Sequence, residues 1–177
     1  MTGIIELTEN GFWKSREHPL ESLERSATLF NELKGNTIIE IGTGIHGEMS
    51  GNSVIVWVEK TKATKIICLD LEEKHVKDVK EATKGFPQVI AKKEDGISFL
   101  KNYKEKIDLL YLDFWVQDKP GDLTGTARAN AYLLAYQAAK DKLQSNSIIL
   151  IDDTDHIDPW KQSYIVPAAR KDGYIVL

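Results

Sequence analysis

Apolar runs rich in β-branched residues alternate along the chain with segments in which apolar residues recur at helical spacing. The runs lie at 37–42, 65–71, 88–93, 107–114, 147–153 and 173–177. Their nearly continuous apolar character is typical of strands that are buried on both faces. The alternation predicts an α/β fold, a three-layer sandwich in which helices cover both faces of a mostly parallel sheet.

Five segments between and around these runs have the composition and spacing of helices. They lie at 19–35, 53–61, 73–85, 125–143 and 158–173. We expect Pro167 to interrupt the last of them, because proline removes a helical hydrogen bond. Residues 1–18 show no clear period and are predicted to be irregular, either a lid or a cover for a sheet edge. The length, 177 residues, suits one domain spanning 1–177.

The loop after the first run, in "TIIEIGTGIHGEMS" (37–50), carries glycines at 42, 44 and 47. Its spacing is similar to that of a turn that binds a dinucleotide pyrophosphate. A helix starting at Gly47 would hold Gly51 in its first turns, which is unfavourable. Ser53 is a better start and a candidate N-cap. A long loop that holds another adenosine-bearing cofactor is therefore favoured over the pyrophosphate.

Each of the first five runs ends on or beside a carboxylate. These residues are Glu40, Asp70, Glu94 with Asp95, Asp113, and Asp152 with Asp153. The carboxyl ends of parallel strands meet at one edge of a sheet, so we expect the acids to share one rim. Like charges on a rim repel and require a cation or hydrogen-bond donors. The alternative for each acid is a cap on the helix that follows.

Composition narrows the class of partner and the compartment. The formal net charge of −4 argues against binding nucleic acid through its phosphates. Cys68 is the only cysteine, which excludes an intrachain disulfide and a thiolate metal cluster, and we expect it to be buried. The chain shows neither a signal peptide nor an apolar run of about 20 residues. A cytoplasmic protein without a membrane partner is expected.

Five short sequences, in order, resemble the motifs of the class I S-adenosylmethionine-dependent methyltransferases over about residues 35–155. They are "EIGTG", "ICLD", "KKEDGISFL", "IDLLYLDFW" and "SNSIILIDD". The resemblance implies a Rossmann-like fold and the cofactor S-adenosylmethionine. That family usually ends its sheet with a β-hairpin, whereas this chain stops at the sixth run. We therefore expect an incomplete terminal hairpin, with a homodimer or residues 1–18 covering the exposed edge.

The same resemblance implies a cofactor site along the strand ends. Its residues would be Glu40, Gly42, Thr43, Gly44, Ser53, Asp70, Leu71, Glu94, Asp95, Gly96 and Asp113. Asp70 would accept hydrogen bonds from the ribose hydroxyls, and Asp95 or Glu94 would receive the adenine amino group. Glu40 would either lie near the methionine part of the cofactor or organise the glycine loop.

"LDFW" followed by "IDD" resembles a narrower subgroup, the metal-dependent catechol-type O-methyltransferases. In that subgroup an acid after the fourth strand and an acid–amide pair after the fifth bind Mg²⁺. The implied ligands here are Asp113, Asp152 and Asp153, which would bring a substrate hydroxyl to the metal. The sequence departs from the pattern at two positions. Val116 replaces the subgroup's lysine, with Lys119 shifted in register, and Asp153 replaces the amide.

The catalytic candidates are Asp113, Lys119 and His156, the last as a general base or as a solvated neighbour of the acids. The leading hypothesis is transfer of a methyl group from S-adenosylmethionine to an oxygen of a small molecule. One alternative is a cofactor-binding domain of the same fold without catalysis, and another is an NAD-dependent oxidoreductase. Methylation of nucleic-acid amines is disfavoured, because "LDFW" is unlike the Asn-Pro-Pro-Tyr-like sequence of those members.

Overall fold

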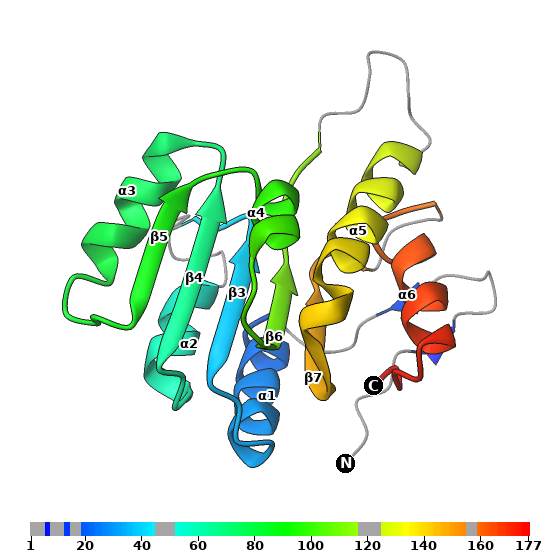
Figure 1. Ribbon diagram of the computed structural model, residues 1–177, viewed down its shortest axis with the longest axis horizontal. Coiled ribbons are helices and arrows are strands. Elements are labelled where there is room, and N and C mark those ends of the chain that lie inside the picture. Colours follow the sequence, from blue (N-terminus) through cyan, green and yellow to red (C-terminus); the bar gives the residue numbers. More distant parts are fainter. Residues whose placement is uncertain (1–5, 8–12, 15–18, 45–51, 117–124, 155–158) are drawn as a thin grey trace.

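The structure is a computed structural model that describes residues 6–7, 13–14, 19–44, 52–116, 125–154 and 159–177. These residues form a parallel sheet between two layers of helices (Figure 1). The main sheet contains β3 (Thr37–Ile41), β4 (Lys65–Asp70), β5 (Val89–Lys93), β6 (Ile107–Leu112) and β7 (Leu143–Ile151). The helices are α1 (Pro19–Glu32), α2 (Ser53–Lys60), α3 (Glu73–Ala82), α4 (Gly96–Asn102), α5 (Thr126–Ala139) and α6 (Gln162–Lys171). The predicted three-layer α/β architecture is confirmed.

The strand order is β5-β4-β3-β6-β7, and all four pairings are parallel. From β3 the chain moves outward through β4 to β5, then crosses back to β6 and continues outward to β7. The order therefore reverses between β3 and β6, where Ile41 pairs with Leu112 near the carboxyl ends. Ligands of open parallel sheets bind in the crevice at such a switch point.

Successive residues of the central strand pack on opposite faces of the sheet, as expected for a strand buried on both sides. Ile38 belongs to the cluster that contains Phe30 of α1 and Trp57 of α2. Ile39 belongs to a second cluster, which contains Leu100 of α4 and Tyr132 of α5. The two apolar layers hold β3 rigidly in place, so its carboxyl end is a firm base for a site.

The predicted sixth strand at 173–177 is wrong. The end of α6 is closed by a turn in which Gly173 has φ 96° and the Tyr174 N–H donates to the Ala169 carbonyl. The Tyr174 hydroxyl then donates to the Gln144 carbonyl, and its ring meets the Tyr136 ring edge-on. Because side chains rather than a backbone ladder hold the tail, no described residue pairs with the outer edge of β7.

Three other elements differ from the sequence-based expectation. Helix α4 was not predicted, although Asp95 caps it by accepting a hydrogen bond from the Ser98 N–H at 2.7 Å. Helix α6 continues through Pro167, since buried Ile165 and Ala169 hold it on the sheet despite the lost hydrogen bond. A two-residue antiparallel pair, β1 (Glu6–Leu7) with β2 (Trp13–Lys14), lies in the segment expected to be irregular.

The structure can be compared with two expectations drawn from composition, one on Cys68 and one on membrane-spanning segments. Cys68 is fully buried in β4, as expected, and burial raises the pKa of its thiol. Among the described helices, none combines the length and the apolar composition needed to cross a bilayer.

Candidate active site

A crevice of about 940 Å³ opens at the carboxyl ends of β3, β4, β6 and β7. Its volume lies in the range of sites that hold a cofactor-sized ligand. The predicted cofactor residues Gly42, Thr43, Gly44, Ser53, Asp70, Leu71, Glu94, Asp95, Gly96 and Asp113 all line it, together with Asp152 and Asp153. The sequence-predicted residues in the described ranges therefore gather at one rim. Glu40 lies beneath the rim, fully buried.

Glu40 connects the end of β3 to α2. Its carboxylate accepts hydrogen bonds from the Ser53 hydroxyl at 2.9 Å and from the Trp57 indole N–H at 2.7 Å. Burial raises the pKa of Glu40 to about 7, and these donors act in the opposite direction. These contacts hold the start of α2 against the end of β3, whereas residues 45–51 of the glycine loop lie outside the described residues, so both predicted roles of Glu40 stay predictions. The predicted N-cap at Ser53 is wrong, because Asn52 occupies that position and Ser53 is the first residue of α2.

Gly42 and Gly96 allow close packing at the rim. Gly42 has φ 86°, and a Cβ there would lie 2.1 Å from the Asp113 carbonyl oxygen. A Cβ on Gly96 would lie 2.4 Å from a methyl carbon of Ile41. The structure thus gives a packing reason for both glycines, in addition to the expected approach of a cofactor.

Asp95 caps α4, which is the alternative role expected for the strand-end acids, whereas α3 has Glu72 at its N-cap and Asp70 holds the turn before that helix. Asp70 Oδ1 accepts a hydrogen bond from the Glu72 N–H at 2.7 Å, and its Oδ2 lies 3.3 Å from His75 Nδ1. A carboxylate offers about four acceptor sites, so this turn contact leaves capacity for a ligand. His75, which lines the crevice beside Asp70, was missed by sequence reasoning.

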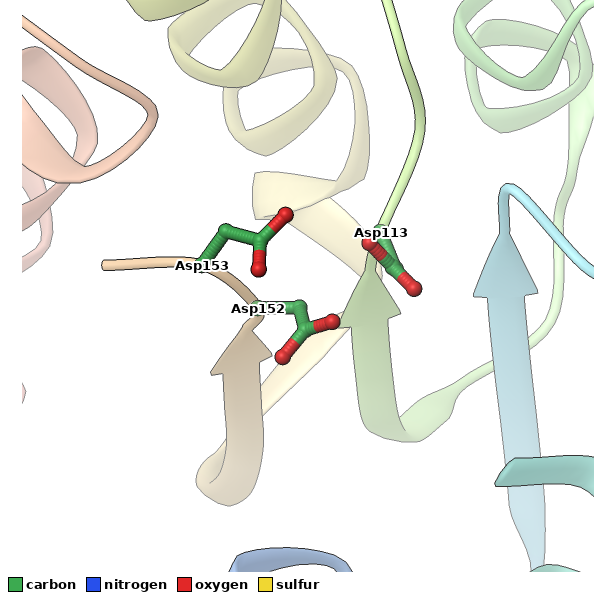
Figure 2. A group of neighbouring side chains, drawn as sticks. All are labelled: Asp113, Asp152 and Asp153. Carbon is green, nitrogen blue, oxygen red and sulfur yellow. The ribbon is translucent and has the colours of Figure 1, made fainter. Parts of the chain in front are cut away.

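Three carboxylates converge where β6 and β7 end (Figure 2). One ligand atom from each of Asp113, Asp152 and Asp153 lies within 4.8 Å of the others. Opposite ligands of a six-coordinate Mg²⁺ or Ca²⁺ are about 4–5 Å apart, so the donor type and the span both fit a hard divalent cation. Burial, followed by the charge of Asp152, raises the pKa of Asp113 to about 8, while Lys161 lowers it.

Lys161, which immediately precedes α6, contacts this cluster from within the protein. Its side chain is only 2% exposed, and its Nζ lies 3.0 Å from Asp153 Oδ2 and 3.3 Å from Asp113 Oδ1. The ammonium also lies 5.6 Å from the centre of the Tyr132 ring. No sequence motif marks this residue, because its partners come from other parts of the chain. A buried cation at the acid cluster is the main feature that sequence reasoning missed.

An arginine packs against two tryptophans, one of which, Trp115, follows Asp113 by two residues and lines the crevice. The Arg128 guanidinium lies 3.8 Å from the centre of the Trp115 ring and 4.4 Å from that of Trp160. Arg128 is buried, whereas Trp115 is 62% exposed and lines the crevice. Stacking on the guanidinium therefore fixes the wall that Trp115 forms. The remaining catalytic candidates, Lys119 and His156, lie outside the described residues.

Comparison with solved structures identifies the fold. An O-methyltransferase from Bacillus cereus in complex with S-adenosylhomocysteine superposes with a TM-score of 0.62 at 13% identity, over 90% of this chain and 73% of its own. A methyltransferase from Podospora anserina, also bound to S-adenosylhomocysteine, gives 0.56 at 21% identity, over 85% and 65%. A Clostridium thermocellum protein assigned as an rRNA methylase gives 0.59 at 10% identity, over 92% and 83%.

No protein-family model and no curated protein sequence matches the chain. The structural likeness establishes that the chain has the Rossmann-like fold of the class I S-adenosylmethionine-dependent methyltransferases. At such low identity the likeness concerns the fold, and function has to be argued from the site.

Proposed function

We propose that the protein is a methyltransferase that uses S-adenosylmethionine and transfers the methyl group to an oxygen of a small-molecule acceptor. The observation that carries this proposal is the crevice at the switch point between β3 and β6. Asp70 lies on one side of it, and the acid cluster of Asp113, Asp152 and Asp153 lies on the other. Such an arrangement supports a cofactor and an acceptor bound next to each other.

The cofactor half of the crevice would be the side formed by β3, β4 and β5. Asp70, at the tip of β4, offers carboxylate oxygens to vicinal ribose hydroxyls, which form strong charge-assisted hydrogen bonds. Asp95 and Gly96 lie at the tip of β5 and would border the adenine. Glu40 supports this half from below through Ser53 and Trp57, and so holds the start of α2 against β3.

The acceptor half would be the side formed by β6 and β7. We further propose that Asp113, Asp152 and Asp153 hold Mg²⁺ there. When bound, such an ion lowers the pKa of a coordinated hydroxyl and so makes its oxygen a better nucleophile. The exposed ring of Trp115 borders the same space and would orient a planar acceptor. Alignment of acceptor and methyl donor would then provide much of the acceleration.

An assay with an isotopically labelled methyl group on S-adenosylmethionine tests the proposal. The acceptors are a panel of catechols, phenols and sugars, with total RNA as a separate arm. We expect label in small-molecule hydroxyl compounds, loss of transfer with a chelator and recovery with Mg²⁺. Asp113→Ala should abolish transfer, whereas the exposed control Asp78→Ala should not. Transfer confined to RNA would contradict the substrate class, and transfer that survives Asp113→Ala would contradict the role of the acids.

A chain that binds S-adenosylhomocysteine yet transfers to no acceptor would support the cofactor-binding domain considered above. The NAD-dependent alternative requires binding of NAD at the same crevice. The cytoplasmic location and the homodimer stay predictions.

A further inference from the structure

Asp153 differs from its neighbours in the acid cluster in backbone and in exposure. It has φ 51°, in the left-handed region that asparagine and aspartate tolerate better than most other residues. Its side chain is 52% exposed, yet one carboxylate oxygen is held by the buried ammonium of Lys161 at 3.0 Å. In the subgroup that the sequence resembles, an uncharged amide follows the acid at this strand end. Compared with that subgroup, this chain has an additional negative charge at position 153. The positive charge of Lys161 lies beside it.

The formal charges of the site balance when this pair is counted. With a cation bound, the carboxylates of Asp113, Asp152 and Asp153 would all be ionised and carry three negative charges, and Lys161 carries one positive charge. A divalent cation would bring the total to zero. With the carboxylate of Asp153 but without Lys161, the loaded site would retain one uncompensated negative charge. Such a charge is unfavourable at a partly buried position.

The particular oxygens that Lys161 contacts also indicate its role at the acid cluster. The Nζ atom approaches Oδ1 of Asp113 and Oδ2 of Asp153, one oxygen of each carboxylate. The other oxygen of each carboxylate does not contact Lys161; that of Asp113, Oδ2, accepts a long hydrogen bond of 3.5 Å from the Tyr111 hydroxyl, and a carboxylate oxygen can accept more than one bond. A donor that holds the outer oxygen of a ligand carboxylate is the usual way in which proteins orient metal ligands.

We propose that Lys161 is a positioning residue that offsets the additional charge of Asp153 and turns Asp113 and Asp153 toward a divalent cation in the crevice. This inference rests on the acid cluster assigned above to Mg²⁺. Lys161 contacts neither acceptor nor cofactor in this scheme. It sets the affinity of the site for a cation and keeps the cluster assembled before the cation arrives.

A double-mutant cycle on Lys161→Met and Asp153→Asn tests the proposal. Asparagine is compatible with the positive φ at position 153. The probe is Mn²⁺, with its dissociation constant followed by electron paramagnetic resonance, and the second readout is the metal-free melting temperature. We expect Lys161→Met to bind Mn²⁺ about tenfold more tightly and Asp153→Asn about tenfold more weakly, since each changes the site by one charge within a few ångströms.

The double variant should return to roughly the affinity of the unmodified protein, because it keeps the charge balance. Without metal, Lys161→Met should lower the melting temperature, and Asp153→Asn should restore part of the loss. Lys161→Arg keeps the charge and should bind Mn²⁺ as the unmodified protein does. The exposed pair Lys140 and Asp172, joined at 2.7 Å, provides the matched control, and the cycle on Lys140→Met and Asp172→Asn should leave Mn²⁺ affinity unchanged.

Purely additive effects of Lys161→Met and Asp153→Asn on the metal-free melting temperature, or an Mn²⁺ affinity that neither single variant changes, would overturn the inference and leave the proposed function standing. If neither the unmodified protein nor any variant binds Mn²⁺, both this inference and the metal part of the proposed function fail. Should Lys161→Met be too unstable to purify, Lys161→Gln takes its place in the same cycle.

Discussion

Gly42 lies directly over Asp113: a Cβ on this glycine would come within 2.1 Å of the Asp113 carbonyl oxygen. The Asp113 N–H in turn donates to the Ile41 carbonyl at 2.9 Å, so the two strand ends are joined at the switch point. The left-handed φ of Gly42, 86°, turns the chain away from β6 at this place. The position of Asp113 therefore depends on residue 42 being a glycine, which has no side chain.

Gly42→Ala should lower the stability by roughly 2 kcal/mol or more, because the methyl group meets backbone atoms and an alanine resists the positive φ. In a domain of this size we expect a fall of about 4–8 °C in melting temperature. Gly85→Ala is the matched control, since a Cβ there meets no atom within 4 Å. Equal melting temperatures of the two variants in differential scanning calorimetry would contradict the packing described here.

The buried carboxyl of Glu40 should make stability depend on pH. Its pKa is raised from 4.5 to about 7, so the folded state retains a proton that the unfolded chain loses. The free energy of unfolding should therefore fall as pH rises from about 4.5 to about 7 and level off above, by about 3 kcal/mol for this group. Glu40→Gln should remove this dependence, because glutamine can accept from Trp57 and donate to Ser53.

Urea unfolding at a series of pH values gives the stability difference between Glu40→Gln and the unmodified protein. That difference should grow across the stated window, whereas the exposed control Glu59→Gln should show no such growth. A difference that stays constant with pH would contradict the raised pKa.

Asp70→Asn separates the role of Asp70 in the turn before α3 from its proposed contact with ribose. The amide oxygen can still accept from the Glu72 N–H, so the turn before α3 should persist. The charge is lost, and hydrogen bonds to charged groups contribute about 1.5–3 kcal/mol each. We expect S-adenosylhomocysteine to bind roughly 10–100-fold more weakly in calorimetric titration, with circular dichroism unchanged. Asp78→Asn, within α3, is the control. Unchanged affinity in Asp70→Asn would argue against the ribose contact.

Arg128 should be sensitive even to a change that keeps its charge. A lysine lacks the planar guanidinium that packs against the rings of Trp115 and Trp160, which meet at 70°, so Arg128→Lys should cost about 1–3 kcal/mol of stability. Acrylamide should also quench tryptophan fluorescence more strongly in this variant, because Trp115 loses its support. Arg170→Lys changes an exposed arginine and should do neither. Identical quenching in the two variants would show that Arg128 does not hold the wall.

The positions of the five strands of the main sheet and of most helices along the chain could be predicted because they depend on local patterns. β-Branched runs such as 37–42 and 65–71 can hardly be anything but buried strands, and their polar last residues fall on one rim once the strands are parallel. The run at 173–177 has the same composition but no strand partner among the described residues. Apolar content alone could not show that Tyr174 is held by side-chain contacts with Tyr136 and Gln144.

The buried cations of the site could not be predicted for a different reason. Lys161 and Arg128 are stable in the interior only because partners from other parts of the chain surround them, namely carboxylates for the lysine and indole rings for the arginine. Helical period places such residues on a face but does not say what that face meets. The acids, by contrast, follow strand ends. Because the strands are parallel, the place of each acid in the sequence already indicates where it lies on the sheet.

The claim on which the account depends is that the strand tips form a site for the nucleoside of S-adenosylmethionine. Isothermal titration of the unmodified protein with S-adenosylhomocysteine, and separately with NAD, measures this directly. We expect one molecule of S-adenosylhomocysteine to bind per chain and NAD to give no heat above dilution. Binding of NAD without binding of S-adenosylhomocysteine would contradict the account.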